Sequence, residues 1–404
     1  MKKQLIQVIN IGSSSLKVSF FCLNKGNLER ILDAQCKDIH ASNPQVEIVT
    51  QEQKNSIKHV KREQVDKIFL LLMKEIEKFI DFHLFSIIGI GHRFIHGGDT
   101  YTTSVTINSS SLKELEKLKA LAPLHNPDGL TLIKASRKYF GSKALQIAVF
   151  DTAFHSTLPS YASQYAIPHS LASKHHIKRY GFHGISHAYL TDKYFEYTKK
   201  KKRPSKLITL HLGNGCSATA IQNGLSIDTS MGFSPAEGLV MGTRAGDMDF
   251  TIIEFLCKKQ HQSVNQITHM LNFESGLEGI SGKTSNVKEL LQNYEKDPNC
   301  RLAIDMFCYR IIKYIGAFTA ILNGVDAIIF SGGIGENSPL IRQMICSKLK
   351  WLGLKISVKK NNSIVNSSLG SIQKISPPSS SIELYVISTD ENLFIAREVL
   401  KNLN

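Results

Sequence analysis

Two apolar runs flank a short polar stretch near the start of the chain. Residues 5–9 and 18–21 are mostly apolar, and residues 10–17 between them contain Gly12, three serines and Lys17. This pattern predicts a β-hairpin with a tight turn. Amides, hydroxyls and a lysine at such a turn can surround phosphate oxygens, although an ordinary polar hairpin turn has the same composition.

The same pattern recurs in the middle of the chain. The apolar residues 207–210 precede a polar glycine turn at 211–217 and a second apolar run at 218–221. A duplicated hairpin predicts two lobes of like topology, each with one phosphate loop. A third glycine loop, at 331–337, follows a predicted strand at 327–330 and precedes a helix that opens near Pro339. Its spacing differs from that of a Rossmann motif, but a glycine turn between strand and helix still favours nucleotide binding.

Hydrophobic periodicity predicts most of the remaining elements. Helices are expected at 65–80, 252–256 and 302–322, and also at 111–118, where Ser111 and Glu114 match a capping box. Strands are expected at 87–90, 146–150 and 384–387, and a last helix from Asn392, capped by Asp390. Residues 22–62 are interpreted as polar and irregular, and residues 361–381 as an exposed loop.

Charged and polar side chains stand where several of these strands end. Arg93 lies among the glycines and histidines of residues 91–98, and Asp151 follows the strand at 146–150. The carboxyl end of a buried strand is where open α/β sheets keep their chemistry, although Asp151 also suits a helix N-cap. Arg244 lies in the long loop at 228–247, which contains four glycines and a proline. We expect Arg93 and Arg244 to come from opposite lobes and hold one anion.

Composition sets the broad class. A chain of 404 residues with 42% hydrophobic content can form two domains. No apolar run approaches the roughly 18 residues of a membrane span, so we expect a cytoplasmic protein without a membrane partner. The seven cysteines have no metal-like spacing and are interpreted as reduced thiols. The net charge of +15 includes only one dense basic run, at 199–203, without interleaved aromatics. We therefore predict a small anionic substrate and no nucleic acid.

Together these loops resemble the acetate kinase (acetokinase) family, within the actin-like superfamily of sugar kinases and Hsp70-type ATPases. The resemblance runs from Asn10 to about Arg397, and residues 180–187 and 228–247 are its most specific parts. It implies an α/β fold of two ribonuclease-H-like (actin-like ATPase) lobes, with a duplicated core and an active-site cleft between them. The expected lobes are residues 1–150 with 388–404, holding the first phosphate loop and the C-terminal helix, and residues 151–387, holding the nucleotide loops and a dimer interface.

The resemblance also implies a reaction. It is the reversible, direct in-line transfer of a phosphoryl group between ATP and acetate, giving acetyl phosphate and ADP, with Mg²⁺ or alternatively Mn²⁺, in a homodimer. The implied catalytic residues are Asp151, His183, Arg244, Arg93 and His125. An acetate carboxylate already carries its nucleophilic charge, so Asp151 is expected to position groups and not to act as a base.

The remaining implied residues fall into three sets. The metal site consists of Asn10 and Glu391, whose oxygens suit a hard cation. Arg93 binds the acetate carboxylate, and an apolar wall against the methyl group consists of Ile95, Leu124, Phe182 and Pro235. The nucleotide site consists of Lys17, His211, Leu212, Gly213, Asn214, Gly215, Asn286, Val287, Lys288, Gly333, Ile334, Gly335, Glu336 and Asn337.

The chain departs from the family pattern at several positions. Ile11 replaces a small residue, Ala236 a leucine, Phe250 a proline and Asp390 an asparagine, and residues 286–288 replace Asp-Phe-Arg. Nucleotide preference therefore stays open. The alternatives are a propionate or butyrate kinase, and a non-enzymatic actin-like protein that binds nucleotide to switch conformation. A pure switch needs no second anion clamp, so Arg93, Arg244, His183 and Asp151 favour the enzyme.

Overall fold

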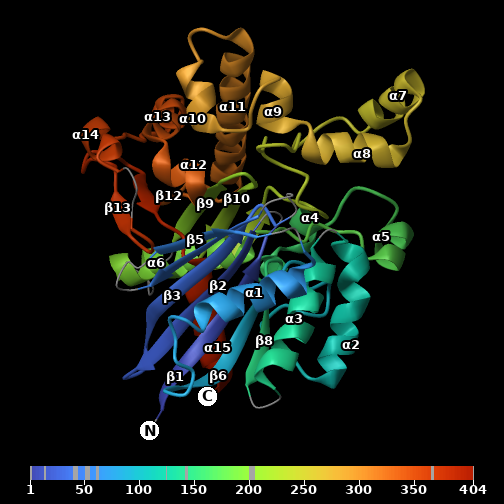
Figure 1. The fold of residues 1–404 in the computed structure, drawn as a ribbon. Coiled ribbons are helices and arrows are strands. Elements are labelled where there is room, and N and C mark those ends of the chain that lie inside the picture. Colours follow the sequence, from blue (N-terminus) through green and yellow to red (C-terminus); the bar gives the residue numbers. More distant parts are fainter. Residues whose placement is uncertain are drawn as a thin grey trace. The chain divides into compact units, whose positions relative to one another are not determined.

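A computed structural model describes residues 2–12, 15–39, 44–50, 55–60, 63–123, 125–141, 144–199, 205–364 and 368–403 (Figure 1). The chain divides into two compact units. The first unit is Met1–Ala153 with Asp390–Asn404, and the second unit is Phe154–Thr389. Asp151 therefore belongs to the first unit, and residues 388–389 belong to the second.

The first unit is built on an eight-stranded sheet in the order β5-β4-β3-β2-β1-β6-β8-β7. β1 pairs antiparallel with β2 and parallel with β6, which in turn pairs parallel with β8. Asn10 lies opposite Lys17 across the β1-β2 pair, so the predicted first hairpin is confirmed. The strands are β1 (Lys3–Ile11), β2 (Ser15–Asn24), β3 (Asn27–Lys37), β4 (Gln45–Thr50), β5 (Asn55–His59), β6 (Phe85–Phe94), β7 (Val105–Thr106) and β8 (Leu145–Phe150).

The prediction that residues 22–62 are irregular is wrong, because β3, β4 and β5 lie there. Leu32, Ala34 and Cys36 of β3 are buried at alternate positions, while polar side chains occupy most positions between them. One face of the strand packs and the other remains polar, so few apolar residues specify it. The alternation with period two was the missed signal.

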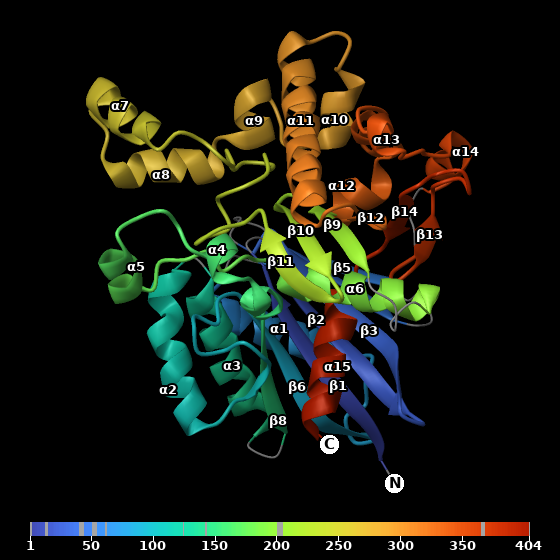
Figure 2. The same ribbon diagram turned by 180° about the vertical axis from the view of Figure 1, so that it is seen from behind.

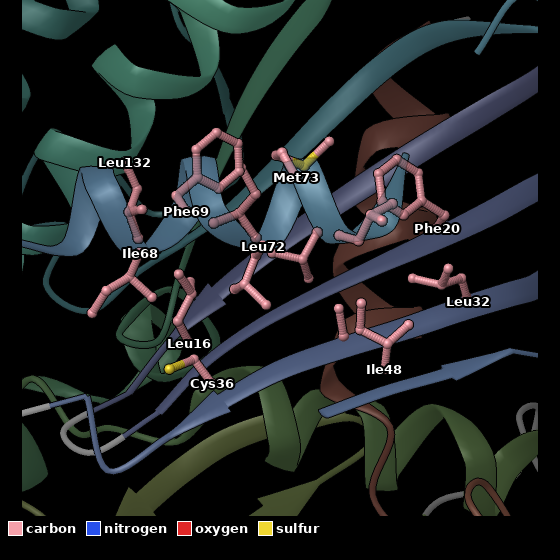
Figure 3. Packing of buried hydrophobic residues seen from close by; sticks show 14 of the residues in the cluster. Leu16, Phe20, Leu32, Cys36, Ile48, Ile68, Phe69, Leu72, Met73 and Leu132 are labelled. Carbon is pink, nitrogen blue, oxygen red and sulfur yellow. The ribbon is translucent and has the colours of Figure 1, made fainter. Parts of the chain in front are cut away.

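The largest core of the first unit lies between one face of this sheet and the helices α1 (Val65–Ile76) and α3 (Asn126–Phe140). These two helices cover that face, and α15 (Glu391–Leu403) covers the other, as the two opposite views agree (Figures 1 and 2). In Figure 3, Ile68 and Leu72 extend from α1 toward the strands that carry Leu16 and Cys36, and all four belong to one buried cluster. Burial of this apolar surface is the main free energy that holds α1 on the sheet.

The second unit repeats this strand plan on a six-stranded sheet, in the order β11-β10-β9-β12-β14-β13. β9 pairs antiparallel with β10 and parallel with β12, which pairs parallel with β14, just as β1 pairs with β2 and β6. The two lobes of like topology predicted from the two hairpins are thereby confirmed. The strands are β9 (Lys206–Leu212), β10 (Cys216–Gln222), β11 (Leu225–Thr229), β12 (Ala327–Ser331), β13 (Ile372–Lys374) and β14 (Glu383–Ile387).

Helices complete both units. In the second unit, α11 (Pro298–Ile321) and α6 (Gly184–Thr198) lie on opposite sides of the sheet (Figures 1 and 2). The others are α2 (Ser109–Lys117), η1 (Leu118–Leu121), η2 (Ala153–Thr157), α4 (Ser160–Ser163), α5 (His169–His175), α7 (Thr251–Gln260), α8 (Val264–Phe273), α9 (Gly276–Ser281), α10 (Val287–Gln292), α12 (Gly332–Asn337), α13 (Pro339–Ser347), η3 (Lys350–Leu352) and α14 (Val358–Asn362). None of the helices in the described ranges is long and apolar enough to cross a membrane.

Three local predictions need correction. The capping box of α2 uses Asn108 with Ser111, and not Ser111 with Glu114, because the helix begins at Ser109. The glycine loop at 331–337 is largely the helix α12. The segment 361–381 is not wholly an exposed loop, because β13 lies within it and Ile364 and Ile375 are buried. The helices expected at 65–80, 252–256 and 302–322 are confirmed as α1, α7 and α11.

Candidate functional site

Strand ends bring four predicted residues together in the first unit. Asn10 lies near the end of β1, Arg93 near the end of β6, and Asp151 directly after β8. These three strands are adjacent and parallel, so their carboxyl ends meet at one edge of the sheet. Glu391, the first residue of α15, joins them there. We call Asn10, Arg93, Asp151 and Glu391 the Asn10 cluster.

Arg93 is the centre of the Asn10 cluster. Its Nη2 and Nε donate to Asp151 Oδ2 at 2.6 and 3.2 Å. Its Nη1 donates to Asn10 Oδ1 at 3.1 Å and to Glu391 Oε2 at 3.4 Å. Asn10 Nδ2 in turn donates to the same Glu391 oxygen at 3.2 Å. The guanidinium is therefore held firmly by Asp151 and more loosely by Glu391.

Asp151 is a buried carboxylate with an unused oxygen. Its side chain is 2% exposed, and Oδ1 has no hydrogen-bond partner among the described residues. Burial raises the pKa of Asp151, the charge of Glu391 raises it further, and Arg93 opposes both effects. Neither oxygen accepts a backbone N–H in the described part of the chain, so Asp151 is not a helix N-cap.

The charges of the Asn10 cluster suit a cation. Two carboxylates face one guanidinium, which leaves an excess of one negative charge when all three are ionised. The donor set contains carboxylate and amide oxygens, which are the ligands that Mg²⁺ prefers. The unused Asp151 Oδ1 adds a further acceptor in the same place. These residues fit a magnesium ion.

A second group of predicted residues meets in the second unit. His183 has a left-handed backbone (φ 57°) directly before α6. Its ring stacks on that of His211, with the centroids 4.4 Å apart and the planes at 15°. The Ser186 hydroxyl lies 2.8 Å from His211 Nδ1 and helps to fix the orientation of that ring. The His183–His211 stack therefore joins the start of α6 to the end of β9, next to the turn between β9 and β10.

Arg244 lies beside this stack. A Cβ atom added to Gly215 would lie 3.0 Å from His183 Nε2 and 3.8 Å from Arg244 Nη1, so glycine allows both side chains to approach the turn. Arg244 Nη1 donates to the Pro235 carbonyl at 3.1 Å, but no described carboxylate forms an ion pair with it. Burial lowers the pKa of Arg244. A desolvated guanidinium without a carboxylate partner favours an anionic ligand.

The two predicted nucleotide loops of the second unit pack on each other. Gly332, the first residue of α12, has φ +75°, and an added Cβ would lie 2.7 Å from the Leu212 carbonyl oxygen. Glu336 Oε1 accepts the backbone N–H groups of Gly332 at 2.9 Å and Thr389 at 3.1 Å. The carboxylate of Glu336 therefore ties α12 to the segment that follows β14, while Gly332 lets the start of α12 approach the end of β9.

The other predicted nucleotide residues lie at element starts. Asn286 caps α10, because its Oδ1 accepts the Lys288 N–H at 3.0 Å. Val287 is buried and Lys288 is exposed. Asn337 Nδ2 donates to the Gly333 carbonyl at 3.0 Å, which closes the last turn of α12. Lys17 is exposed on β2 of the first unit.

The predicted apolar wall is divided between the units. Ile95 is buried in the first unit, while Phe182 is buried and Pro235 half-buried in the second. His125 is half-buried directly before α3. Leu124 lies outside the described residues, as do Ser13 and Ser14 of the first turn.

Sequence reasoning missed the residues that support Glu391. Asn392 Oδ1 accepts from Asn10 Nδ2 at 2.8 Å, and Arg30 binds Asp390. The expected cap is confirmed, since Asp390 Oδ1 accepts the Leu393 N–H at 3.0 Å. Arg30 carried no usable signal, because its partner is 360 positions away.

Comparison with known proteins covers nearly the whole chain. The model of the acetokinase family matches residues 5–397. An acetate kinase of Solibacter usitatus is 42% identical over 98% of this chain and 97% of the relative, and one of Chloroherpeton thalassium is 40% identical over 98% of each.

Solved structures agree with these relatives. A propionate kinase of Francisella tularensis is 38% identical, with a TM-score of 0.88, over 99% of this chain and 100% of the other. An acetate kinase of Porphyromonas gingivalis is 32% identical, also with a TM-score of 0.88, over the full length of both.

Proposed function

Because the chain belongs to the acetokinase family, we propose that it transfers a phosphoryl group reversibly between ATP and acetate, giving acetyl phosphate and ADP. The observation that carries this proposal is the pair of arginine sites. Arg93 is anchored by a carboxylate, whereas Arg244 has no described carboxylate partner and lies beside a glycine turn. Phosphoryl transfer needs mainly alignment and charge stabilisation, which two such guanidinium groups supply.

Arg93 binds the acetate carboxylate in this proposal. The short contact with Asp151 Oδ2, at 2.6 Å, keeps the guanidinium oriented, while the longer contact with Glu391 Oε2, at 3.4 Å, is exchanged for an acetate oxygen. Asp151 acts as the orienting residue, because the acetate carboxylate is already ionised at neutral pH and needs no base. His125 assists in the first unit.

Arg244 and His183 stabilise negative charge on the transferring group. Both flank Gly215, so their donors face the turn of residues 211–215. The amides of that turn, with Lys17, bind the ATP phosphates, as glycine turns do. The adenosine lies against residues 286–288 and residues 333–337 of α12.

Mg²⁺ is held by Asn10 and Glu391 in the proposed enzyme, and Mn²⁺ is the alternative. When bound, it neutralises charge on the nucleotide phosphates. The excess negative charge of the Asn10 cluster supports this assignment.

Acetate is proposed as the substrate in preference to propionate or butyrate because of Ile95. The apolar wall of Ile95, Leu124, Phe182 and Pro235 is the part that distinguishes carboxylates of equal charge, and we expect Ile95 to crowd any chain longer than acetate. Because the chain is also similar to a propionate kinase, acetate must be compared with propionate and butyrate as substrates.

We also propose a cytoplasmic homodimer, with its interface on the second unit and without nucleic-acid or membrane partners. Large apolar side chains that are exposed on and beside α7 and α8 support association, namely Phe250 (81% exposed), Phe255 (58%) and Val264 (58%). Light scattering coupled to gel filtration measures the mass directly.

A hydroxamate assay tests the reaction. The purified chain is given ATP, Mg²⁺ and acetate, propionate or butyrate, and acyl phosphate is trapped with hydroxylamine. We expect acetate to give the highest kcat/KM and Arg244→Ala to remove nearly all turnover. Lys401→Met, an exposed change on α15, serves as the control. Nucleotide binding without acyl phosphate from any acid would instead support the non-enzymatic switch.

A further inference from the structure

The start of α15 is fixed to β3 by a charged contact. Arg30, on β3, donates through Nη2 to Asp390 Oδ1 and through Nη1 to Asp33 Oδ1. Asp390 directly precedes α15, and its side chain is 8% exposed. Its Oδ1 also caps the helix at Leu393. One carboxylate oxygen therefore caps the start of the helix and accepts from the guanidinium.

A second path joins Arg30 to the Asn10 cluster. Arg30 Nη1 donates to the Ser19 hydroxyl at 3.1 Å, and Asn392 Nδ2 donates to the same oxygen at 2.7 Å. Asn392 Oδ1 then accepts from Asn10 Nδ2 at 2.8 Å. Both neighbours of Glu391 in the sequence are thus connected to Arg30, one directly and one through Ser19.

The chemistry of the two paths requires an arginine. Only a planar fork reaches Asp390 with one nitrogen and Ser19 and Asp33 with the other. Removing the guanidinium would leave the mostly buried Asp390 carboxylate uncompensated, which favours movement of the first turn of α15. That turn carries Glu391, so its position depends on Arg30.

We propose that Arg30 is a positioning residue for the magnesium site: it fixes the first turn of α15 and thereby holds Glu391 next to Asn10. The inference rests on the proposed function, because it takes Asn10 and Glu391 as the metal residues. Partners behind metal ligands typically contribute 10- to 100-fold to metal affinity.

Metal binding tests the proposal without relying on activity. Free Mn²⁺ is measured by electron paramagnetic resonance with the full chain and ADP. Arg30→Met should weaken Mn²⁺ binding about 10- to 100-fold, and Glu391→Gln should weaken it as well. Lys401→Met, which removes the exposed ion pair with Glu398 on the same helix, should leave it unchanged. Equal Mn²⁺ affinity in wild type and Arg30→Met would overturn the proposal.

A milder variant serves as a control for misfolding of Arg30→Met. Asp390→Asn keeps the size and the capping oxygen but removes the charge, and it should weaken Mn²⁺ binding in the same direction. In the Arg30→Met background it should add little, because the two residues act as a pair. Hydrogen exchange of the metal-free protein should be faster at Asn392 and Leu393 in Arg30→Met. Additive losses, or unchanged exchange, would contradict the positioning role.

The two proposals fail separately. Wild type whose Mn²⁺ affinity depends on Arg30 and Glu391 but that forms no acyl phosphate overturns the reaction and leaves the positioning role standing. Wild type that forms acetyl phosphate, with Mn²⁺ affinity independent of Arg30, overturns the positioning role alone. Wild type that binds no Mn²⁺ in the presence of ADP overturns the magnesium site and the role of Arg30 with it.

Discussion

At the scale of single residues, the two arginines have different surroundings. Arg93 is held by Asp151 and Glu391, and Arg244 has a carbonyl but no described carboxylate. We expect Arg93→Ala to raise the acetate KM strongly, because it removes ground-state binding, and Arg244→Ala to lower kcat. Each loss should be on the order of 10² or more. Initial rates over a matrix of acetate and ATP concentrations separate the effect on the acetate KM from the effect on kcat. Equal KM effects with unchanged kcat would rule out this division.

Ile95 carries the prediction of substrate size. One methylene group in an apolar pocket is worth roughly 1 to 3 kcal/mol, so propionate should be used about ten- to hundredfold less efficiently than acetate. Ile95→Ala should narrow that gap, because Ile95 is buried and its truncation makes room. The measurement is the ratio of kcat/KM for the two acids. If Ile95→Ala leaves the ratio of kcat/KM for acetate and propionate unchanged, Ile95 does not line the acetate pocket.

At the scale of elements, the start of α12 depends on one glycine. Gly332 has φ +75°, and a Cβ there would lie 2.7 Å from the Leu212 carbonyl oxygen. Gly332→Ala should therefore destabilise the fold by roughly 1 to 3 kcal/mol and raise the KM for ATP. Gly316→Ala, on α11 and outside the predicted nucleotide site, is the control, because an added Cβ there meets nothing within 4 Å. Denaturant unfolding and ATP titrations of both variants measure the difference, and equal effects would refute it.

Which elements the sequence predicts depends on how many faces they bury. Strands β1, β9 and β12 are buried on both faces and stand out as apolar runs, whereas β3 buries only alternate residues and was missed. The sequence predicts a loop at 331–337 because glycines disfavour helix, yet the contact of Glu336 with Thr389 holds α12. Tertiary contacts of this kind leave no local pattern.

The candidate site follows the same rule. Arg93 and Asp151 stand out in the sequence because each lies at the end of a predicted strand, whereas a role for Asn10 is implied only by the resemblance to the acetokinase family. The match to that family confirms the resemblance. The pairing of Asn10 with Glu391, and the support from Arg30 and Asn392, join residues from both ends of the chain. Such pairs become visible only once the sheet is formed.

At the scale of the whole molecule, buried histidines make both units sensitive to acid. In the first unit, burial lowers the pKa of His92 to about 4, although its hydrogen bond with Gln146 opposes this. In the second unit, burial lowers the pKa of His155 to about 4 and that of His187 well below its usual value. Each histidine is thus neutral in the folded state, whereas it takes up a proton near pH 6.5 when unfolded.

The sign of the effect on stability follows from this difference. A depressed folded pKa contributes stability that is present above the unfolded pKa and is lost as the pH falls toward the folded one. For His92 the loss between pH 7 and pH 4 should be about 3 kcal/mol. His92→Gln, which keeps a polar group able to bond to Gln146, should lose less stability over that range than wild type, whereas His169→Gln, an exposed change, should follow wild type. Urea unfolding at pH 7, 6, 5 and 4 measures the free energies. If wild type and His92→Gln lose stability in parallel, the buried imidazole of His92 is not a source of the acid sensitivity.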